Sequence, residues 1–309
     1  MSHVVEYRGR FAPSPTGALH FGSLVAALGS YCDARHANGQ WFVRIEDVDA
    51  PRARREHPAA HLRTLERYGF TWDGEVLAQS ARTEIYRDAL NRLIDQEAVF
   101  PCTCTRADLS RAPISSGGDA VYPGTCRQRL ACDAAALPRS AWRMRVEGAP
   151  PIAFTDRLQG PQRQELRSQV GDFVVRRSDG LYAYQLAVVI DDALQGITDV
   201  VRGADLLAST ARQIYVQQRL GFPTPRYLHL PVAVNVRGEK LSKQTSAAPL
   251  PLTPLPALTA AWRFLNQPAP PEPPGSVGDF WTWAVRAWSP ALLPAVPTLQ
   301  APQETWPAD

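Results

Sequence analysis

The segment Arg10–Ser23, with the sequence RFAPSPTGALHFGS, constrains the fold of this chain more than any other stretch. Its two prolines and Gly17 predict a stiff loop with one hinge. Residues 22–38 carry apolar side chains at helical spacing, and Gly39 is expected to cap the helix at its C-terminus. His20 would then lie at a helix N-terminus, where free backbone N–H groups and the helix dipole favour anions. The segment therefore predicts an anion-binding turn.

A short buried strand is predicted at 41–45, and it ends in Glu46 and Asp47. A loop, a helix, a strand and acidic residues at the strand end are typical of an α/β fold. In open α/β sheets ligands lie at the carboxyl ends of the strands, so Glu46 and Asp47 are candidates for ligand contact.

Three more strands are expected later in the chain. The buried run 184–190 ends in two aspartates, the run 200–205 leads into a helix over 205–220, and 228–236 holds the last strand. Arg202 falls at a strand-to-helix turn, which is a favoured place to bind an anion. A salt bridge to Asp199 or Asp205 is the alternative.

Two amphipathic packing helices are predicted at 58–70 and 81–99, with a turn between them at 73–80. A small β-rich insertion is predicted at 142–183, and two short helices are predicted at 257–266 and 277–288, near the C-terminal end. Three tryptophans at 281, 283 and 288 are expected to form core or a docking face.

The composition is that of an ordinary globular chain of 309 residues, 45% hydrophobic and 20% charged, long enough for two or more domains. No apolar run approaches the ~20 residues of a membrane span, and no signal peptide is recognised. The five cysteines do not resemble a disulfide framework, so we expect a reduced, cytoplasmic compartment. The net charge of +3 offers no argument for nucleic-acid binding.

The basic residues have an unusual distribution. Of 33 lysines and arginines only two are lysines, and both lie in one short loop, as Lys240 and Lys243. An ammonium group is a compact point charge and is not equivalent to a planar guanidinium. The loop is therefore predicted to bring ammonium groups to phosphate.

Three cysteines occur in one loop-rich segment. Cys102 and Cys104 form a Cys-x-Cys pair, and Cys126 follows a stretch rich in proline, serine and glycine. Three thiolates and one further donor would complete a tetrahedral zinc site. The fourth donor is either Tyr122 or Cys132. Unliganded buried cysteines are the alternative, and the spacing favours zinc.

The chain has neither a Gly-x4-Gly-Lys-Ser/Thr loop nor a Gly-x-Gly-x-x-Gly turn. An imidazole at a helix start and a late two-lysine loop instead suit adenylyl transfer. That reaction requires the attacking carboxylate to be aligned with the α-phosphate and the charge on pyrophosphate to be neutralised. His20, the helix N-terminus, Lys240, Lys243 and a Mg²⁺ ion would supply this.

These motifs resemble those of the class I aminoacyl-tRNA synthetases. Pro13–Gly22 resembles their "HIGH" motif, with Ser23 at the place of its last histidine, and residues 240–244 resemble their "KMSKS" loop. The segments 10–15, 44–47 and 201–205 are similar to the glutamate branch. The cysteine pattern and the short length are similar to the short members of that branch, which act on the queuosine base of tRNA(Asp). The resemblance covers about residues 5–245.

The resemblance implies an α/β fold with a Rossmann-type catalytic domain that is split by a zinc-containing insertion. The implied parts are 1–100, the first half of the catalytic domain; 101–180, the insertion; 181–245, the second half with the lysine loop; and 246–309, a proline-rich linker and short helical region. It also implies ATP-dependent, tRNA-independent activation of L-glutamate and transfer of the glutamyl group to queuosine at the wobble position of tRNA(Asp). A monomer is expected.

Site residues follow from the same resemblance. The catalytic residues are His20, Lys240 and Lys243. The glutamate site comprises Arg10, Phe11, Ala12, Pro13, Ser14, Glu46, Tyr184 and Arg202. The ATP site comprises His20, Gly22, Ser23 and Lys243, and the zinc ligands are Cys102, Cys104, Tyr122 and Cys126. Arg10 and Arg202 are expected to bind the carboxylates of the substrate, since arginine binds a carboxylate bidentately, and Glu46 its ammonium group.

Two other functions are weighed against this one. A glutamyl-tRNA synthetase that charges tRNA(Glu), or a truncated relative with another acceptor, would need an anticodon-binding region, which the proline-rich last 65 residues are not expected to supply. A non-catalytic RNA- or protein-binding paralogue would have no use for His20 and both lysines.

Overall fold

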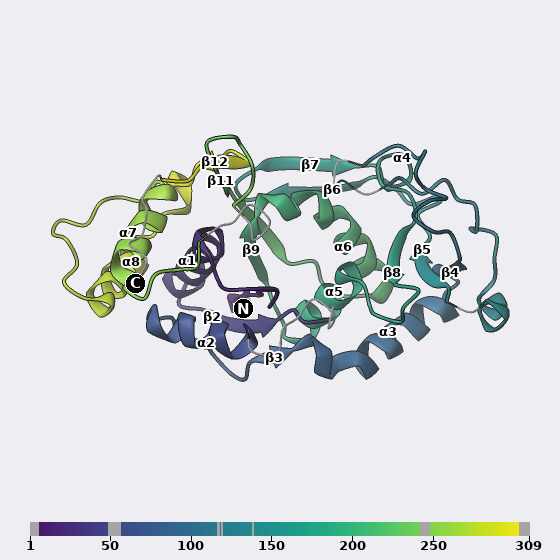
Figure 1. The fold of residues 1–309 in the computed structure, drawn as a ribbon, viewed down its shortest axis with the longest axis horizontal. Coiled ribbons are helices and arrows are strands. Elements are labelled where there is room, and N and C mark those ends of the chain that lie inside the picture. Colours follow the sequence, from purple (N-terminus) through teal and green to yellow (C-terminus); the bar gives the residue numbers. More distant parts are fainter. Residues whose placement is uncertain are drawn as a thin grey trace, which may run out of the picture.

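The computed structural model describes residues 6–48, 57–115, 118, 120–137, 139–241 and 248–302. Parallel strands form its centre, an antiparallel insertion lies at one end, and helices of the C-terminal region lie at the other (Figure 1). Within the described ranges no helix is both long and apolar enough to cross a membrane.

The central strands pair in two parallel groups. β1 (Arg8–Phe11) pairs with β2 (Gln40–Ile45), which pairs with the short β3 (Leu77–Ala78). β9 (Asp199–Gly203) pairs with β10 (Arg226–Leu230). The Thr198 N–H donates to the Arg8 carbonyl at 3.0 Å, so the two groups lie side by side. The strand predicted at 41–45 is confirmed as β2, and the run predicted at 200–205 forms β9 but ends at Gly203. Both strands are buried along most of their length, as is typical of parallel strands covered on both faces.

Helix α1 (Phe21–His36) packs on β1 and β9. A Cβ at Gly29 would lie 2.5 Å from Leu230 Cδ1, so glycine allows the helix to approach β10 closely. The predicted cap at Gly39 is wrong in position. Ala37 is the C-cap, and Asn38 takes the left-handed conformation with φ 53°, which an asparagine tolerates well.

The predicted packing helices appear as α2 (His57–Arg67) and α3 (Thr83–Asp95). The connection at 73–80, predicted as a turn, also contains β3. Short 3₁₀ turns occur at Gln79–Arg82, Ala131–Ala136, Ala204–Leu206 and Pro290–Leu292.

The β-rich insertion is confirmed. β4 (Val99–Cys102), β5 (Ala141–Met144) and β8 (Phe173–Arg176) form an antiparallel sheet. β6 (Ile152–Asp156) and β7 (Gly160–Gln164) form a hairpin, and α4 (Leu166–Gln169) connects it to β8.

The strand predicted at 184–190 is wrong, because these residues begin helix α5 (Tyr184–Leu194). Residues 186–190 are all at most 2% exposed, on every side of the helix, since α5 packs against α3, β8 and α6 (Leu207–Leu220). A short run that is apolar on all sides carries no periodicity that separates a buried helix from a strand. Asp191 and Asp192 therefore lie in the last turn of a helix.

Both predicted C-terminal helices are confirmed, as α7 (Pro254–Phe264) and α8 (Val277–Ala287), and both pack on α1. Trp281 and Trp288 are buried there, and the Trp288 indole donates to Asp33 Oδ1 at 3.2 Å. The strand expected at 228–236 divides into β10 and β11 (Val232–Val234), and it is not the last one. β12 (Thr298–Gln300) pairs in parallel with β11.

Candidate active site

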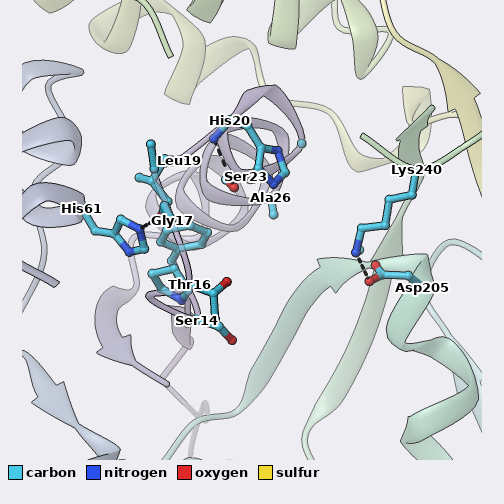
Figure 2. A pocket seen from close by; sticks show the side chains of 15 residues that line it. Ser14, Thr16, Gly17, Leu19, His20, Ser23, Ala26, His61, Asp205 and Lys240 are labelled. Carbon is cyan, nitrogen blue, oxygen red and sulfur yellow. Dashed lines mark hydrogen bonds and ion pairs between the residues drawn. The ribbon is translucent and has the colours of Figure 1, made fainter. Parts of the chain in front are cut away.

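The loop before α1 forms one wall of a cavity of about 690 Å³, and the end of β9 with the lysine loop forms the other (Figure 2). Of the predicted residues, the following line it: Phe11, Pro13, Ser14, His20, Gly22, Ser23 and Lys240. Ala12 belongs to the same loop but is not part of this lining. The loop and the lysine segment, more than 200 residues apart in sequence, thus face each other as predicted.

His20 is the N-cap of α1, with an extended backbone (φ −127°), and its carbonyl accepts the first helical bond from Leu24 at 3.0 Å. Its own N–H donates to Ser23 Oγ at 3.4 Å. A Cβ at Gly22 would lie 3.2 Å from the His20 ring, so a larger residue here would require the ring to shift by a few tenths of an ångström. The N-terminus of α1 therefore opens toward the cavity, where it favours an anion.

Lys240 lies across the cavity from His20 and forms an ion pair with Asp205, Nζ to Oδ2, at 2.5 Å. Its side chain is about half exposed, at 51%. A phosphate that bound here would share this ammonium group with Asp205. Lys243 lies outside the described residues.

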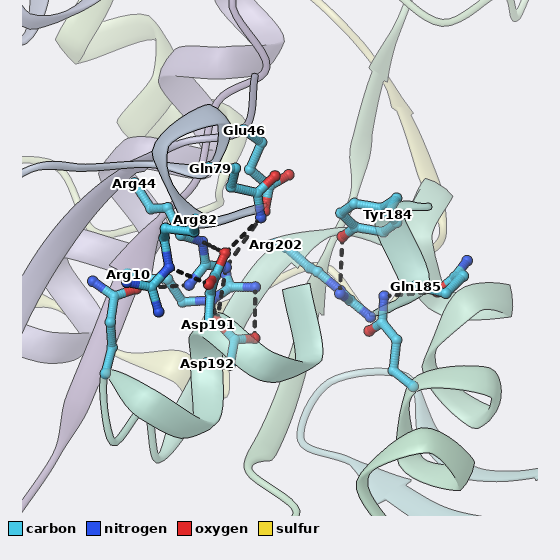
Figure 3. Close-up of polar contacts among 12 residues, drawn as sticks. Arg10, Arg44, Glu46, Gln79, Arg82, Tyr184, Gln185, Asp191, Asp192 and Arg202 are labelled. Carbon is cyan, nitrogen blue, oxygen red and sulfur yellow. Dashed lines mark hydrogen bonds and ion pairs between the residues drawn. The ribbon is translucent and has the colours of Figure 1, made fainter. Parts of the chain in front are cut away.

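Behind the cavity three arginines and three carboxylates form what we call the arginine–carboxylate cluster (Figure 3). Its members are Arg10, Arg44, Arg82, Glu46, Asp191 and Asp192. The positive and negative charges are equal in number, so the cluster is formally neutral when all six groups are ionised. The aspartates come from the last turn of α5.

Asp192 holds Arg10 in this cluster, with distances of 3.1 Å to Nε and 3.4 Å to Nη2, and Arg44 Nη2 lies 2.8 Å from the same carboxylate. Burial raises the pKa of Asp192, but Arg10 and Arg44 outweigh it and the net pKa is lowered. Arg10 is thus already paired, and a substrate carboxylate would compete with Asp192 for it. The role of Arg10 toward the substrate stays a prediction.

Glu46 has a weaker place in the cluster. Among the described residues its one ion pair is with Arg44 Nη2, at 3.4 Å, and its side chain is 8% exposed. Burial raises its pKa above the usual value although both nearby arginines lower it. The carboxylate retains capacity to accept hydrogen bonds from an ammonium group.

Arg202 differs from the arginines of the cluster because its hydrogen-bond partners are all neutral. It is 5% exposed, and its Nε donates to His229 Nε2 at 3.0 Å and its Nη1 to the Tyr184 hydroxyl at 3.3 Å. Nη2 donates to Thr210 Oγ1 at 3.0 Å and to a backbone carbonyl. In the described part of the chain no carboxylate pairs with it, so the salt bridge weighed from the sequence is absent.

The two aspartates considered for that salt bridge have other partners. Asp205 pairs with Lys240, and Asp199 Oδ2 lies 2.7 Å from Arg226 Nη2. A buried guanidinium without an anionic partner is costly, and such charges are normally paired. Arg202 is therefore the best candidate in this region for binding an anion from outside the chain.

Sequence reasoning did not find His229 and Asp156, which stand behind Arg202. Both are buried, and His229 Nδ1 lies 2.6 Å from Asp156 Oδ2. No motif links two residues that are 73 positions apart, and both lie within ordinary strand sequence. Asp192 was noticed only as part of an acidic pair, and its pairing with Arg10 depends on α5 being a helix.

The three cysteines come together as predicted. The Sγ atoms of Cys102, Cys104 and Cys126 lie within 4.8 Å of one another, and Cys104 and Cys126 are 3.6 Å apart. The Tyr122 hydroxyl lies 3.4 Å from Cys102 Sγ and 3.6 Å from Cys104 Sγ. A tetrahedron around Zn²⁺ with Zn–S bonds of ~2.3 Å has edges of roughly 3.8 Å, so the four donor atoms fit such an ion.

Cys132, the other candidate for the fourth donor, is exposed and contacts its neighbour Asp133 at 4.0 Å. Burial raises the pKa of the Cys126 thiol, but hydrogen bonds from the Tyr122 hydroxyl and the Thr103 backbone outweigh it and lower the pKa to about 7. A thiol that ionises near neutral pH is suited to bind a metal. Because the Tyr122 hydroxyl lies beside the thiols and Cys132 lies beside Asp133, the geometry favours Tyr122 over Cys132 as the fourth donor.

A second cavity, of about 630 Å³, lies between the insertion and the N-terminal turn of α5. Arg143, Phe173, Tyr184, Gln185 and Arg212 are among its lining residues. Since the Tyr184 hydroxyl also contacts Arg202, this side chain connects the second cavity with the predicted glutamate site.

Known proteins are similar to this chain in sequence and in fold. A family model described as "tRNA synthetases class I (E and Q), catalytic domain" matches residues 6–249. A glutamyl-Q tRNA(Asp) synthetase of Aromatoleum aromaticum is 55% identical over 96% of this chain and 93% of its own length. Proteins with the same name from Thiobacillus denitrificans and Dechloromonas aromatica are 52% and 54% identical, over 95% and 92% of this chain and 97% and 94% of their own lengths.

Two solved structures share the fold. They are a glutamate–tRNA synthetase of Elizabethkingia anophelis and a glutamate–tRNA ligase of Elizabethkingia meningosepticum, with TM-scores of 0.79 and 0.80 and identities of 23% and 24%. Each alignment covers 96% of this chain, and 68% and 67% of the respective neighbour. The class I synthetase fold expected from the motifs is therefore confirmed. The chain belongs to the class I tRNA synthetases of the E and Q branch and, within that branch, to the family of glutamyl-Q tRNA(Asp) synthetases.

Proposed function

We propose that this chain activates L-glutamate with ATP in the absence of tRNA and transfers the glutamyl group to the queuosine base at the wobble position of tRNA(Asp). The names of relatives that are more than 50% identical over nearly the whole chain support the acceptor and the amino acid. The geometry of the site supports the activation step.

The observation that carries this proposal is the buried guanidinium of Arg202, whose hydrogen-bond partners among the described residues are all neutral. A carboxylate of glutamate would neutralise it, and the Tyr184 hydroxyl lies beside the same guanidinium to complete the contact. Glu46 would accept the ammonium group of the substrate. Arg10 would assist with a carboxylate while it stays bound to Asp192.

In the activation step a carboxylate oxygen of glutamate attacks the α-phosphorus of ATP, and the bond to the β-phosphate oxygen breaks to release pyrophosphate. The cavity lined by His20, Gly22, Ser23 and Lys240 would hold the nucleotide, with the N-terminus of α1 facing its phosphates. Lys240 and Lys243 would neutralise the charge that builds on pyrophosphate. A Mg²⁺ ion bound to the phosphates would add to this neutralisation.

In the transfer step a nucleophilic group of the acceptor attacks the carbonyl carbon of the adenylate, and AMP leaves. The second cavity offers a place for the acceptor base, because its aromatic and guanidinium side chains are of the kind on which unstacked bases pack. The zinc ion that the Cys102, Cys104, Tyr122 and Cys126 donors fit would stabilise the insertion that forms one side of this cavity.

Pyrophosphate exchange with ATP tests the activation step. We expect exchange with L-glutamate alone, without tRNA. Transfer of labelled glutamate to tRNA(Asp) that contains queuosine, with queuosine-free tRNA(Asp) and tRNA(Glu) as controls, tests the acceptor. Exchange that required tRNA(Glu) would favour a tRNA(Glu)-charging enzyme instead, and no exchange under any condition would favour a non-catalytic paralogue.

A further inference from the structure

The neutral surroundings of Arg202 depend on a pair of residues that touch neither cavity. We propose that His229, oriented by Asp156, is a positioning residue that fixes the Arg202 guanidinium through a neutral acceptor and so keeps its positive charge available for the carboxylate of the amino acid. This inference rests on the proposed function, because it assumes that Arg202 meets the substrate.

The hydrogen-bond pattern defines the state of the imidazole. Nδ1 faces the Asp156 carboxylate at 2.6 Å and therefore carries the proton, which leaves Nε2 as the acceptor for Arg202 Nε at 3.0 Å. The His229 backbone N–H also donates to Asp156 Oδ1, at 3.2 Å. Tautomer and ring orientation are thus both determined by one carboxylate.

Asp156 is itself held in place by the backbone. It ends β6, and its Oδ1 accepts the N–H groups of Leu158 and Gln159 at 3.0 and 2.8 Å in the turn to β7. The hairpin of the insertion therefore orients a histidine on β10, and that histidine orients an arginine on β9. This arrangement links the insertion to the predicted glutamate site.

An imidazole at this position has a different effect from a carboxylate. Arg10 shows the contrast, since Asp192 contacts its guanidinium directly and compensates its charge. At Arg202 the carboxylate of Asp156 is one ring width away, and the imidazole accepts the hydrogen bond without adding charge. Burial, and secondly the Arg202 charge, lower the pKa of His229 to about 4 in spite of Asp156, so the ring is neutral at physiological pH.

A purely structural role is the competing explanation. The His229 ring stacks on Tyr227 with a centroid distance of 6.0 Å and is fully buried, so any substitution can lower stability. A stability loss alone would not change the affinity for glutamate in the folded protein. A comparison of the affinity for glutamate with the affinity for ATP therefore separates a positioning role from a purely structural one.

The experiment compares His229→Gln, whose side-chain oxygen can replace Nε2 as an acceptor, with His229→Leu, which has no acceptor. Glutamate and ATP are titrated separately in pyrophosphate exchange, glutamate binding is measured by calorimetry, and urea unfolding checks the fold. Because His229→Leu removes a hydrogen bond to a charged group, we expect it to raise the KM and Kd for glutamate about 10- to 100-fold. The KM for ATP should stay within about twofold, and His229→Gln should recover most of the glutamate affinity.

The inference is overturned if folded His229→Leu binds glutamate like the wild type, if glutamate and ATP affinities fall equally, or if His229→Gln is no better than His229→Leu. If His229→Leu does not fold, Asp156→Asn and His229→Gln provide the comparison: Asp156→Asn should weaken glutamate binding more than His229→Gln does, and the reverse order rejects the inference. Failure of the proposed function appears differently, as a wild-type protein that shows no glutamate-dependent exchange. Calorimetry on that protein still decides the inference, because a wild type that does not bind glutamate refutes it as well.

Discussion

Replacing Arg202 by methionine tests whether this residue is there for the substrate or for the fold. Methionine is apolar, unbranched and long enough to fill much of the same space. The guanidinium is 5% exposed and has no carboxylate partner among the described residues, which costs several kcal/mol of stability. Its removal also leaves the Tyr184 hydroxyl without this donor, at about 1–3 kcal/mol, whereas His229 Nε2 keeps the Thr210 hydroxyl at 3.3 Å. These contributions oppose each other, so we expect the unfolding free energy to change by less than about 2 kcal/mol.

The effect on glutamate is expected to be much larger. Removing one partner of a buried, hydrogen-bonded charge pair costs about 3–5 kcal/mol. At about 1.4 kcal/mol for each factor of ten, the Arg202→Met variant should lose roughly a hundredfold to a few thousandfold in kcat/KM for glutamate. Pyrophosphate exchange measures this loss, and the KM for ATP serves as the internal reference.

Arg10→Met is the matched control, because Arg10 is just as buried but pairs with Asp192. Its removal leaves Asp192 with Arg44 alone, so we expect a stability loss of up to about 3–5 kcal/mol in urea unfolding. The two variants should therefore separate in stability, which Arg10→Met lowers and Arg202→Met changes little, while both should weaken the use of glutamate. If Arg202→Met unfolds as readily as Arg10→Met while its KM for glutamate is unchanged, the reasoning about Arg202 is refuted.

Three further predictions follow from the site and the core. Burial raises the pKa of Glu46, so ionised Glu46 destabilises the folded state above its unfolded pKa of 4.5. Glu46→Gln should thus be at least as stable as the wild type at pH 7, with an advantage that disappears below about pH 4.5 in pH-dependent melts, whereas its KM for glutamate should rise; a lower stability at pH 7 would contradict this. Cys104→Ser should lose zinc by metal analysis and lower the melting temperature, and a metal-free wild-type protein would reject the site. Gly29→Ala should destabilise by about 1–3 kcal/mol, because the new Cβ would lie 2.5 Å from Leu230; an unchanged urea midpoint would show that α1 can shift at no cost.

Local sequence was sufficient for the parts of the site whose chemistry lies in consecutive residues. The stiff loop, His20 at the start of α1, Gly22 and the lysine segment form short motifs, and the structure places those described around one cavity. The three cysteines were also recognisable, because the spacing of metal ligands in a loop is a local property.

The secondary structure of the run 184–190 could not be predicted from its sequence pattern. An apolar segment of seven residues is compatible with a buried strand and with a buried helix, and packing against the neighbouring helices favours the helix α5. That outcome moved Asp191 and Asp192 to a helix end, where they reach Arg10 and Arg44. Tyr122 was distinguished from Cys132 in the same way, by which side chain the folded loop turns toward the thiols.

The sequence by itself determined that this chain carries the motifs of an adenylate-forming synthetase, since those motifs are contiguous and few other functions require them. Only the tertiary structure decided which charges are already compensated. Arg10 and Arg202 received the same role from the sequence, binding a carboxylate of the substrate, yet one contacts Asp192 and the other an imidazole. The distinction arises because a charge is neutralised by whatever lies within a few ångströms of it, and those neighbours come from distant parts of the chain.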